Sequence, residues 1–307
     1  MEFTVMLSTF GDHASPEAFR RLARTAEDVG FDAVWAGDHI VFPEEVPDEY
    51  PFSRDGSPPP SFHVDSDAYT VFEILPHLAG ITDSVDLGVN TSIVPYRNPL
   101  LLTKEAFTLE ALSDGRFDLG VAPGWLRTEF ESLGIPFEER GTRTDEFLEI
   151  FERARTEGKF SFDGPHHSFD TTGFYPTPEE GRPKIWVGGV SGASFRRVGQ
   201  YGDAWTTVWD RPDDIERRKA RIMNAWRDFD REGEPEIALM RAVHCGTDTD
   251  LDTSRPLIGD PSSVVEDLEE YADAGLTRLT MDFFTTDIDE QVEQVERFGD
   301  EIVSEFQ

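Results

Sequence analysis

Side chains that could take part in chemistry stand directly after several apolar runs of this sequence. Asp38 and His39 follow one run, Asn90 and Thr91 follow another, and Trp125 follows a third. The groups at these positions are mostly small, amide and aromatic, and ligand pockets combine such apolar surfaces with a few polar groups. This set of residue types suits a flat organic cofactor better than a metal ion.

A fourth apolar run ends in Gly188-Gly189-Val190-Ser191 and leads into a helical pattern. Backbone N–H groups at the N-terminus of a helix, together with a serine hydroxyl, favour an anion. We expect an anion-binding turn here, with an ordinary helix cap as the alternative. The sequence contains no HExxH, nucleophile elbow or GxxxxGK[ST] motif, and its histidines and carboxylates are too scattered to indicate a metal site.

These residues need a scaffold that brings the ends of several strands together. Apolar runs alternate with helical patterns along the chain, and each strand–helix–strand unit implies parallel strands. Eight such strands close most economically into an α/β (β/α)8 TIM barrel, whose active sites form at the C-terminal ends of the strands. An open doubly wound sheet is the alternative. The expected strands are residues 3–8, 31–36, 85–91, 117–122, 184–188, 204–208, 237–244 and 278–283, and the expected helices are residues 15–30, 67–81, 99–112, 142–155, 192–201, 213–232, 262–274 and 288–306.

Two connections are too long for plain loops between a strand and the next helix. Residues 41–65 follow the second strand and are rich in proline and acidic residues, and residues 157–183 precede the fifth strand. Long loops in compact domains are commonly lids or binding loops. We expect one barrel domain over residues 1–307, with insertions after strands 2 and 4.

Charge is the unusual feature of the composition. The chain has 62 acidic and 28 basic residues, which gives a formal net charge of −34 at pH 7. Such a surface repels nucleic acid and anionic membranes, which bind through Lys and Arg, and it strains the compact state by self-repulsion. Molar salt shortens the Debye length to about 3 Å. We therefore expect a protein of a halophilic, salt-rich cytosol, and an acidic enzyme of an ordinary cytosol is the alternative.

Cysteine content and hydropathy indicate a cytoplasmic protein. The single cysteine, Cys245, excludes an intrachain disulfide or a cysteine-based metal cluster. The first residues lack the basic and apolar regions of a signal peptide, and no stretch approaches about 18 uninterrupted apolar residues. We expect a small-molecule substrate as the partner, and neither nucleic acid nor a membrane.

Several longer motifs resemble the luciferase-like family of flavin- and deazaflavin-dependent oxidoreductases, particularly the branch that uses coenzyme F₄₂₀. They occur in the family's order and span residues 1 to about 290. The motifs are Ala36-Gly37-Asp38-His39, Leu87-Gly88-Val89-Asn90-Thr91-Ser92-Ile93-Val94-Pro95-Tyr96-Arg97-Asn98-Pro99, Leu112-Ser113-Asp114-Gly115-Arg116-Phe117-Asp118-Leu119-Gly120-Val121 continuing to Gly124-Trp125, Leu133-Gly134-Ile135-Pro136-Phe137-Glu138-Glu139-Arg140, and Pro183-Lys184-Ile185-Trp186-Val187-Gly188-Gly189.

The resemblance implies a barrel that holds a flavin-like ring at its mouth. The ring would lean on a bulge with a non-prolyl cis peptide at Asn90-Thr91, with an ordinary trans junction as the alternative. Asp38 and His39 resemble the family's pair after the second strand, and His39 would be the catalytic residue that donates or accepts the substrate proton. A structural histidine under the ring is the alternative for His39.

The resemblance also assigns cofactor-binding residues farther along the chain. Gly188, Gly189, Val190 and Ser191 would hold the cofactor phosphate, and Arg196 or Arg197 could assist. Trp125 would line the pocket, with a plain core role as its alternative.

Two departures from the family bear on the reaction. Pro123 stands where the flavin-mononucleotide luciferases carry a phosphate-binding arginine, which weakens the flavin-mononucleotide (FMN) expectation. The neighbours of Trp125 lack the acidic proton donor of the sugar-phosphate dehydrogenase branch, which disfavours that reaction. A net charge of −34 fits a polyanionic cofactor only if molar salt screens it and Arg97, Arg127 and Arg196 concentrate positive potential locally.

Three functions follow from this resemblance. The first hypothesis is an oxidoreductase that transfers hydride between coenzyme F₄₂₀ and a small organic substrate. The second is a two-component monooxygenase that uses FMNH2 and O2, with FMN as the alternative cofactor. The third is a cofactor-binding protein without turnover. Family members often dimerise, so we expect a homodimer.

Overall fold

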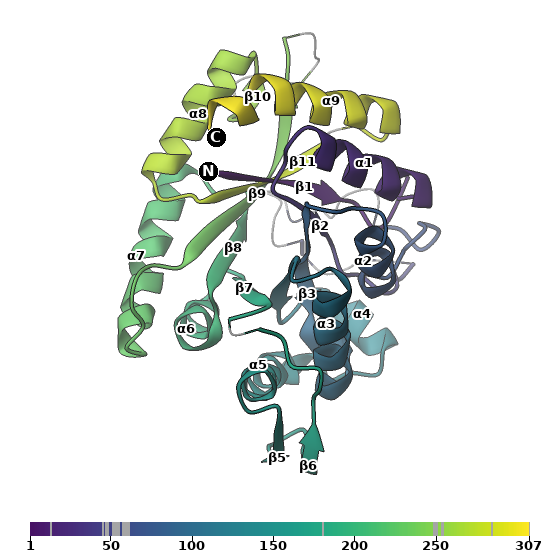
Figure 1. Cartoon of the computed structure of the whole chain (residues 1–307), viewed down its shortest axis with the longest axis vertical. Helices are drawn as coiled ribbons and strands as arrows, with labels where there is room; N and C mark the ends of the chain where they lie inside the picture. Colours follow the sequence, from purple (N-terminus) through teal and green to yellow (C-terminus); the bar gives the residue numbers. More distant parts are fainter. Residues whose placement is uncertain are drawn as a thin grey trace.

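Parallel strands form a closed barrel in the computed structural model (Figure 1), which describes residues 1–12, 14–44, 46, 49–50, 56, 62–179, 181–247, 251–252, 255–283 and 285–306. The barrel strands are β1 (Glu2–Leu7), β2 (Ala33–Ala36), β3 (Asp86–Ile93), β4 (Phe117–Ala122), β7 (Lys184–Gly188), β8 (Ala204–Val208), β9 (Glu236–Cys245) and β11 (Arg278–Phe283). Their order around the ring is β9-β11-β1-β2-β3-β4-β7-β8, and β8 pairs with β9 to close it. The expected (β/α)8 barrel is confirmed.

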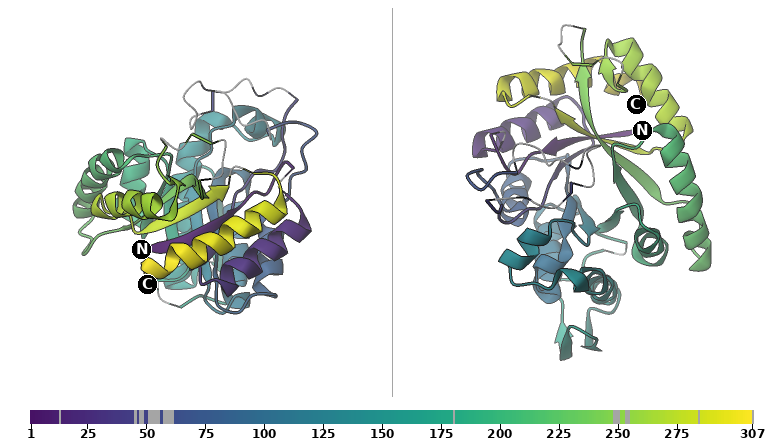
Figure 2. Two further views of the ribbon diagram at one scale, coloured as in Figure 1. Left: turned by 90° about the horizontal axis from the view of Figure 1, so that it is seen from above. Right: turned by 180° about the vertical axis from the view of Figure 1, so that it is seen from behind.

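Helices cover the outside of the barrel (Figures 1 and 2). Proline opens α1, α3, α7 and α8, where its missing N–H costs no helical hydrogen bond. Ser15, Asn98 and Asp260 cap α1, α3 and α8 by accepting hydrogen bonds from backbone N–H groups of the first turn. The helices are α1 (Pro16–Asp28), α2 (Val71–Ala79), α3 (Pro99–Leu112), α5 (Arg140–Glu157), α6 (Gly192–Tyr201), α7 (Pro212–Asp228), α8 (Pro261–Asp273) and α9 (Ile288–Glu301).

The helix expected over residues 67–81 begins later than the sequence pattern indicates. Residues 67–69 bond to the chain after β1: Gly11 donates to the Asp67 carbonyl, Tyr69 donates to the Thr9 carbonyl, and Phe10 forms an isolated bridge with Ala68. This tertiary pairing holds the segment extended, so α2 starts only at Val71. Much of the expected lid, residues 41–65, lies outside the described residues.

The chain between the fourth and fifth barrel strands contains structure that the sequence analysis missed. A short helix, α4 (Arg127–Ser132), follows β4, and an antiparallel hairpin of β5 (Lys159–Asp163) and β6 (Ser168–Gly173) follows α5. The hairpin extends from one end of the molecule (Figure 1). The aromatic side chains of the hairpin, Phe160, Phe162 and Phe169, and that of Phe174 just after it, form a cluster with ring centroids 5.1 to 6.2 Å apart.

Other helix ends differ only slightly from expectation. α7 ends at Asp228 rather than at residue 232, and Asp230 adopts a left-handed conformation with φ of 54°. α9 ends at Glu301, followed by the short 3-10 helix η3 (Val303–Glu305). Two further 3-10 helices, η1 (Val94–Tyr96) and η2 (Phe137–Glu139), and the two-residue strand β10 (Ile258–Gly259), complete the elements of the described chain. None of the described helices is both long and apolar enough to cross a membrane.

A packed layer of side chains fills the inside of the barrel. Trp35 of β2 meets Trp186 of β7 from across the ring, with ring centroids 5.0 Å apart. The guanidinium carbon of Arg278 lies 5.0 and 5.2 Å from these two ring centroids. Because this layer blocks the interior, a ligand must bind above it, at the C-terminal ends of the strands.

Candidate active site

The end of β3 forms a bulge at the barrel mouth. The peptide bond between Asn90 and Thr91 is cis, as expected, and the pairing of β3 with β4 shifts register between Val89 and Ser92. Thr206 of β8 donates from Oγ1 to the Asn90 Oδ1 atom at 3.1 Å, which ties the bulge to a strand on the far side of β4 and β7.

Two glycines on the neighbouring strands make room for this bulge. A Cβ atom on Gly120 of β4 would lie 2.0 Å from the Val89 carbonyl oxygen, and one on Gly188 of β7 would lie 3.1 Å from Thr91 Cγ2. Contacts below 3.0 Å essentially never occur for real Cβ atoms. Only glycine therefore fits at Gly120 while the bulge keeps its position.

Asp38 holds the bulge strand by hydrogen bonds to Ser92 and Ile93. Its carboxylate accepts two hydrogen bonds from the Arg97 guanidinium, at 2.6 and 2.9 Å, and one each from Ser92 Oγ and the Ile93 N–H, both at 3.0 Å. The Asp38 side chain is fully buried. Both oxygens are engaged inside the protein, so Asp38 fixes the position of the bulge.

His39 is held by a buried carboxylate that the sequence analysis missed. Glu129 of α4 has 0% exposure of its side chain, and its Oε2 lies 2.9 Å from His39 Nδ1. The other carboxylate oxygen accepts from the backbone N–H groups of Ile40 at 2.6 Å and Val41 at 3.3 Å. The Tyr96 hydroxyl donates to Oε2 at 2.7 Å.

These bonds determine the charge of Glu129. Burial raises its pKa, but the hydrogen bonds from His39, Ile40 and Tyr96 outweigh burial and lower the pKa below its ordinary value. Burial and the neighbouring Glu129 raise the pKa of Tyr96. At neutral pH the site therefore holds a carboxylate that accepts and a phenol that donates.

Aromatic rings enclose the imidazole of His39. The rings of Phe10, Phe42 and Phe62 have centroids 5.5, 5.3 and 5.0 Å from that of His39. Phe62 also lies 5.7 Å from Trp125, so the expected pocket residue Trp125 belongs to the same aromatic cluster. The His39 side chain keeps 13% exposure, and its Nε2 atom has no partner among the described residues.

The turn after β7 forms the N-terminal cap of α6, which is the alternative stated for it above. Gly189 has φ of 105°, a region that favours glycine, and its carbonyl accepts from Trp205 Nε1 at 2.9 Å. Ser191 caps α6 by accepting from the Ser194 N–H at 3.1 Å, and Val190 is exposed. The next residue, Gly192, borders a surface groove of about 380 Å³ between α6 and α7 that Arg196 also lines.

Several arginines expected near a cofactor are occupied elsewhere. Arg197 is buried and donates to Asp145 at 2.7 Å and to the Gly141 carbonyl at 2.9 Å. Arg97 is paired with Asp38, and Arg127 is paired with Glu138 at 2.8 Å. Of the arginines considered from the sequence, Arg196 alone has no ion-pair partner among the described residues.

The structure brings the expected site residues to one end of the barrel. They lie near the C-terminal ends of β3 and β7 and in the loops after β2, β4 and β7, and parallel strands place these ends on the same side. Asp38 joins the loop after β2 to the bulge, and Glu129 joins the loop after β4 to His39. Glu129 lies 90 residues from His39 in sequence, and only its position shortly after the Gly124-Trp125 motif could have drawn attention to it. The described residues contain no group of three or more His, Cys, Asp or Glu side chains that could hold a metal ion.

Comparison with known proteins gives relatives of two cofactor types. A family model described as luciferase-like monooxygenase matches residues 1–253. An uncharacterised protein of Mycobacterium tuberculosis is 31% identical over 201 residues, which are 66% of this chain and 68% of that protein. The F₄₂₀-dependent glucose-6-phosphate dehydrogenase of Kineococcus radiotolerans is 27% identical over 195 residues, or 62% and 52% of the two chains. The FMNH2-dependent dimethylsulfone monooxygenase of Pseudomonas fluorescens is 31% identical over 125 residues, or 39% and 34%.

Solved structures show the same fold at low sequence identity. A monooxygenase from Streptomyces bottropensis superposes with a TM-score of 0.82 at 17% identity, covering 100% of both chains. An F₄₂₀-dependent secondary alcohol dehydrogenase in complex with an F₄₂₀-acetone adduct gives a TM-score of 0.80 at 16% identity, covering 98% of both. At these low identities the structural similarity shows the fold alone.

Proposed function

The chain belongs to the luciferase-like monooxygenase family, and from that premise we propose that it transfers hydride between coenzyme F₄₂₀ and a small organic substrate. The family contains both F₄₂₀-dependent and FMNH2-dependent oxidoreductases. The observation that carries the proposal is His39, which is anchored through Nδ1 and whose Nε2 atom, at the barrel mouth, has no partner among the residues that the structure describes. Such a histidine can accept or donate one proton at a defined atom.

The residues at the mouth fit a flat ring with an anionic tail. The bulge at Asn90 and Thr91 offers a fixed shelf, and the exposed turn at Val190 and Ser191 offers backbone N–H groups at the start of α6. When bound, the deazaflavin supplies the hydride chemistry. The protein would position the ring on the shelf, hold its phosphate at the turn, and place His39 Nε2 near the reacting face.

Pro123 favours F₄₂₀ over FMN in this proposal, because an arginine that would hold the FMN phosphate is absent there. The second candidate is a monooxygenase that uses FMNH2 and O2, and the dimethylsulfone monooxygenase among the relatives supports it. Both reactions use the same shelf and the same histidine. They differ in the cofactor and in the need for O2.

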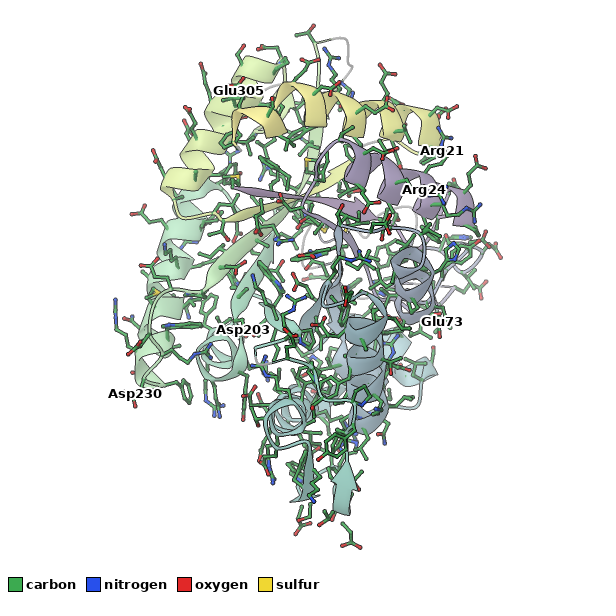
Figure 3. The ribbon with its side chains drawn as sticks, in the orientation of Figure 1. Arg21, Arg24, Glu73, Asp203, Asp230 and Glu305 are labelled. Carbon is green, nitrogen blue, oxygen red and sulfur yellow. The ribbon has the colours of Figure 1, made fainter. Side chains whose placement is uncertain are left out.

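The charge supports a proposal about the cellular setting. With a net charge of −34, we propose that the enzyme works in the cytoplasm in molar salt, on a small-molecule substrate and without nucleic acid or membrane partners. That it forms a homodimer is a further proposal, which rests on the family resemblance. Figure 3 shows acidic side chains such as Glu73, Asp230 and Glu305 at the surface of the molecule.

A fluorescence-quenching titration in molar KCl tests the cofactor. The protein is titrated with F₄₂₀ and with FMN side by side. Micromolar binding of F₄₂₀ alone supports hydride transfer, tighter binding of FMN moves the assignment to the monooxygenase, and binding of neither contradicts both. Turnover assays with the cofactor that binds then compare His39→Ala with His77→Ala, an exposed histidine on α2. Full turnover by His39→Ala would remove His39 from the mechanism.

A further inference from the structure

Glu129 carries its carboxylate in a fully buried position, which is unusual for a charged side chain. It lies on α4, its side chain is 0% exposed, and its four hydrogen bonds come from two separate segments, residues 39–41 and Tyr96. A buried carboxylate of this kind must be fully satisfied, since burying an unpaired charge is expensive. Glu129 can therefore accept all four bonds only if each partner donates.

That condition fixes the proton on His39. The backbone N–H groups of Ile40 and Val41 can only donate, and the Tyr96 hydroxyl has no other acceptor among the described residues. The remaining bond, to His39 Nδ1, is made by an N–H donor, because an ionised carboxylate has no proton to give. A neutral imidazole carries one N–H. With that N–H on Nδ1, Nε2 presents a lone pair.

We propose that Glu129 is a positioning residue that locks His39 in the Nδ1–H tautomer, so that protons enter and leave the site only at Nε2. This inference rests on the proposed function for its catalytic meaning, but its structural content concerns the protein alone. Without such a partner, neutral imidazole exchanges its proton between both nitrogens. A single tautomer and ring orientation keeps the acceptor lone pair aimed in one direction.

The aromatic cluster prevents the ring from escaping this arrangement. Phe10 and Phe62 meet the imidazole edge-on, at 88° and 82°, and Phe42 lies tilted against it at 35°. A half-turn of the ring about the Cβ–Cγ bond would put Cδ2 where Nδ1 now lies and would break the bond to Glu129. It would also push against these three phenyl rings, which pack at close contact distances.

Glu129 also joins His39 to the shelf. Tyr96 lies in η1, directly after the bulge strand, so one carboxylate links the loop after β2, the turn after β3 and its own helix after β4. Two buried carboxylates, Asp38 and Glu129, therefore tie the segment that carries His39 to the bulge strand and to the turn after it.

The test is a ¹⁵N NMR measurement of imidazole tautomers in the full-length protein without cofactor, at about pH 9, where an ordinary histidine is neutral. Among the signals of the seven histidines, the His39 signal is the one that disappears in His39→Ala. Wild-type His39 is expected to show the proton on Nδ1. A proton on Nε2, or an equal mixture, would overturn the proposal whatever the variants do.

Glu129→Gln supplies the sharpest variant. The two backbone donors, Ile40 and Val41, select the amide oxygen, so the amide NH2 must face His39 and can only donate to Nδ1. We expect the proton to move to Nε2. Tyr96→Phe, which removes one donor and leaves the carboxylate, and Glu131→Gln, an exposed residue of the same helix, should keep the Nδ1–H tautomer.

Kinetics separate the inference from the proposed function. With the cofactor that binds in the titration, Glu129→Gln is expected to keep the cofactor Kd within about twofold and to lower kcat by about 100-fold, a typical contribution of acid–base catalysis. An unchanged tautomer in Glu129→Gln contradicts the positioning role even if the enzyme turns over. A changed tautomer in a protein that binds neither cofactor would support the lock and refute the proposed function.

Discussion

Gly120 and Gly188 show how a missing side chain shapes the barrel mouth. The bulge of β3 pushes the Val89 carbonyl and the Thr91 methyl group toward β4 and β7, into space that a Cβ atom would fill. The pair Asp38 and Arg97 then holds the bulge from the other side. The shelf is thus held in place by the buried Asp38–Arg97 ion pair, and the missing side chains of Gly120 and Gly188 leave room for it.

Gly120→Ala should damage the shelf directly. The new methyl group would lie 2.0 Å from a backbone oxygen, so the bulge must move. We expect a loss of about 1–3 kcal/mol in the free energy of unfolding, which is typical of overpacking, together with weaker cofactor binding. Urea unfolding in molar KCl and the fluorescence titration measure the two effects. Gly80→Ala, whose Cβ would meet only ordinary contacts at 3.6 Å or more, is the matched control; equal behaviour of the two variants would refute the steric argument.

At the scale of elements, the hairpin of β5 and β6 depends on one residue of α5. Glu146 is buried and accepts from the N–H groups of His166 and His167, both at 3.1 Å, and from His167 Nδ1 at 2.7 Å. The turn of the hairpin is thus folded around a carboxylate from a neighbouring helix, as a capping residue holds the end of a helix.

Glu146→Ala should loosen the hairpin and leave the barrel intact. Losing three charge-assisted hydrogen bonds is expected to lower the free energy of local opening by about 1–3 kcal/mol. Hydrogen exchange of residues 164–168 should accelerate, while exchange in β1, β2 and β11 stays unchanged. Glu149→Ala, at an exposed position of α5, serves as the control. Uniform acceleration across the barrel would show that the hairpin is not a separate unit.

The cap of α8 predicts a dependence on pH. Hydrogen bonds from Ser262 and Ser263 lower the pKa of Asp260 to about 2 from 3.8. A carboxyl group whose pKa is lowered by folding stabilises the native state above its unfolded pKa, and this contribution is lost as pH falls through the folded value. Asp260→Asn keeps a capping oxygen and removes the charge. Its stability deficit relative to wild type should be constant above about pH 4 and should vanish toward about pH 2.

Urea unfolding at a series of pH values measures this deficit. Ser262→Ala, which removes one hydroxyl donor, should move the transition to higher pH. A deficit that grows as the solution becomes more acidic would have the wrong sign and would contradict the assignment.

At the scale of the whole molecule, charge is the dominant feature. The fold pairs many arginines with acids, including Arg97, Arg182 and Arg218, yet the net charge of −34 remains on the surface. Side chains at this surface repel one another across distances that physiological salt screens only in part, since the Debye length is then about 8 Å.

Salt should therefore stabilise the protein strongly. We expect the Tm to rise steadily from about 0.1 M to molar KCl, as the Debye length falls from about 10 Å to about 3 Å. Calorimetry at several KCl concentrations measures the rise, and sucrose at matched water activity controls for general exclusion effects. A Tm that is the same at both ends of the KCl series would exclude the halophilic interpretation.

The sequence by itself determined the repeating architecture of this protein. Strand and helix periods are local properties, so the eight strands and the helices starting at Pro99 and Gly192 could be predicted closely. The family motifs further placed the cis peptide at Asn90-Thr91 and the turn at Gly188-Gly189, because each motif is a short continuous segment.

Only the tertiary structure decided which distant residues meet. Glu129 reaches His39 across 90 residues, Asp38 meets Arg97 across 59, and residues 67–69 lose their helix to pairing with the chain after β1. Arg197 is diverted from the expected cofactor site to Asp145. Closure of the barrel brings these groups together, and no local pattern records a contact that depends on closing a ring of eight strands.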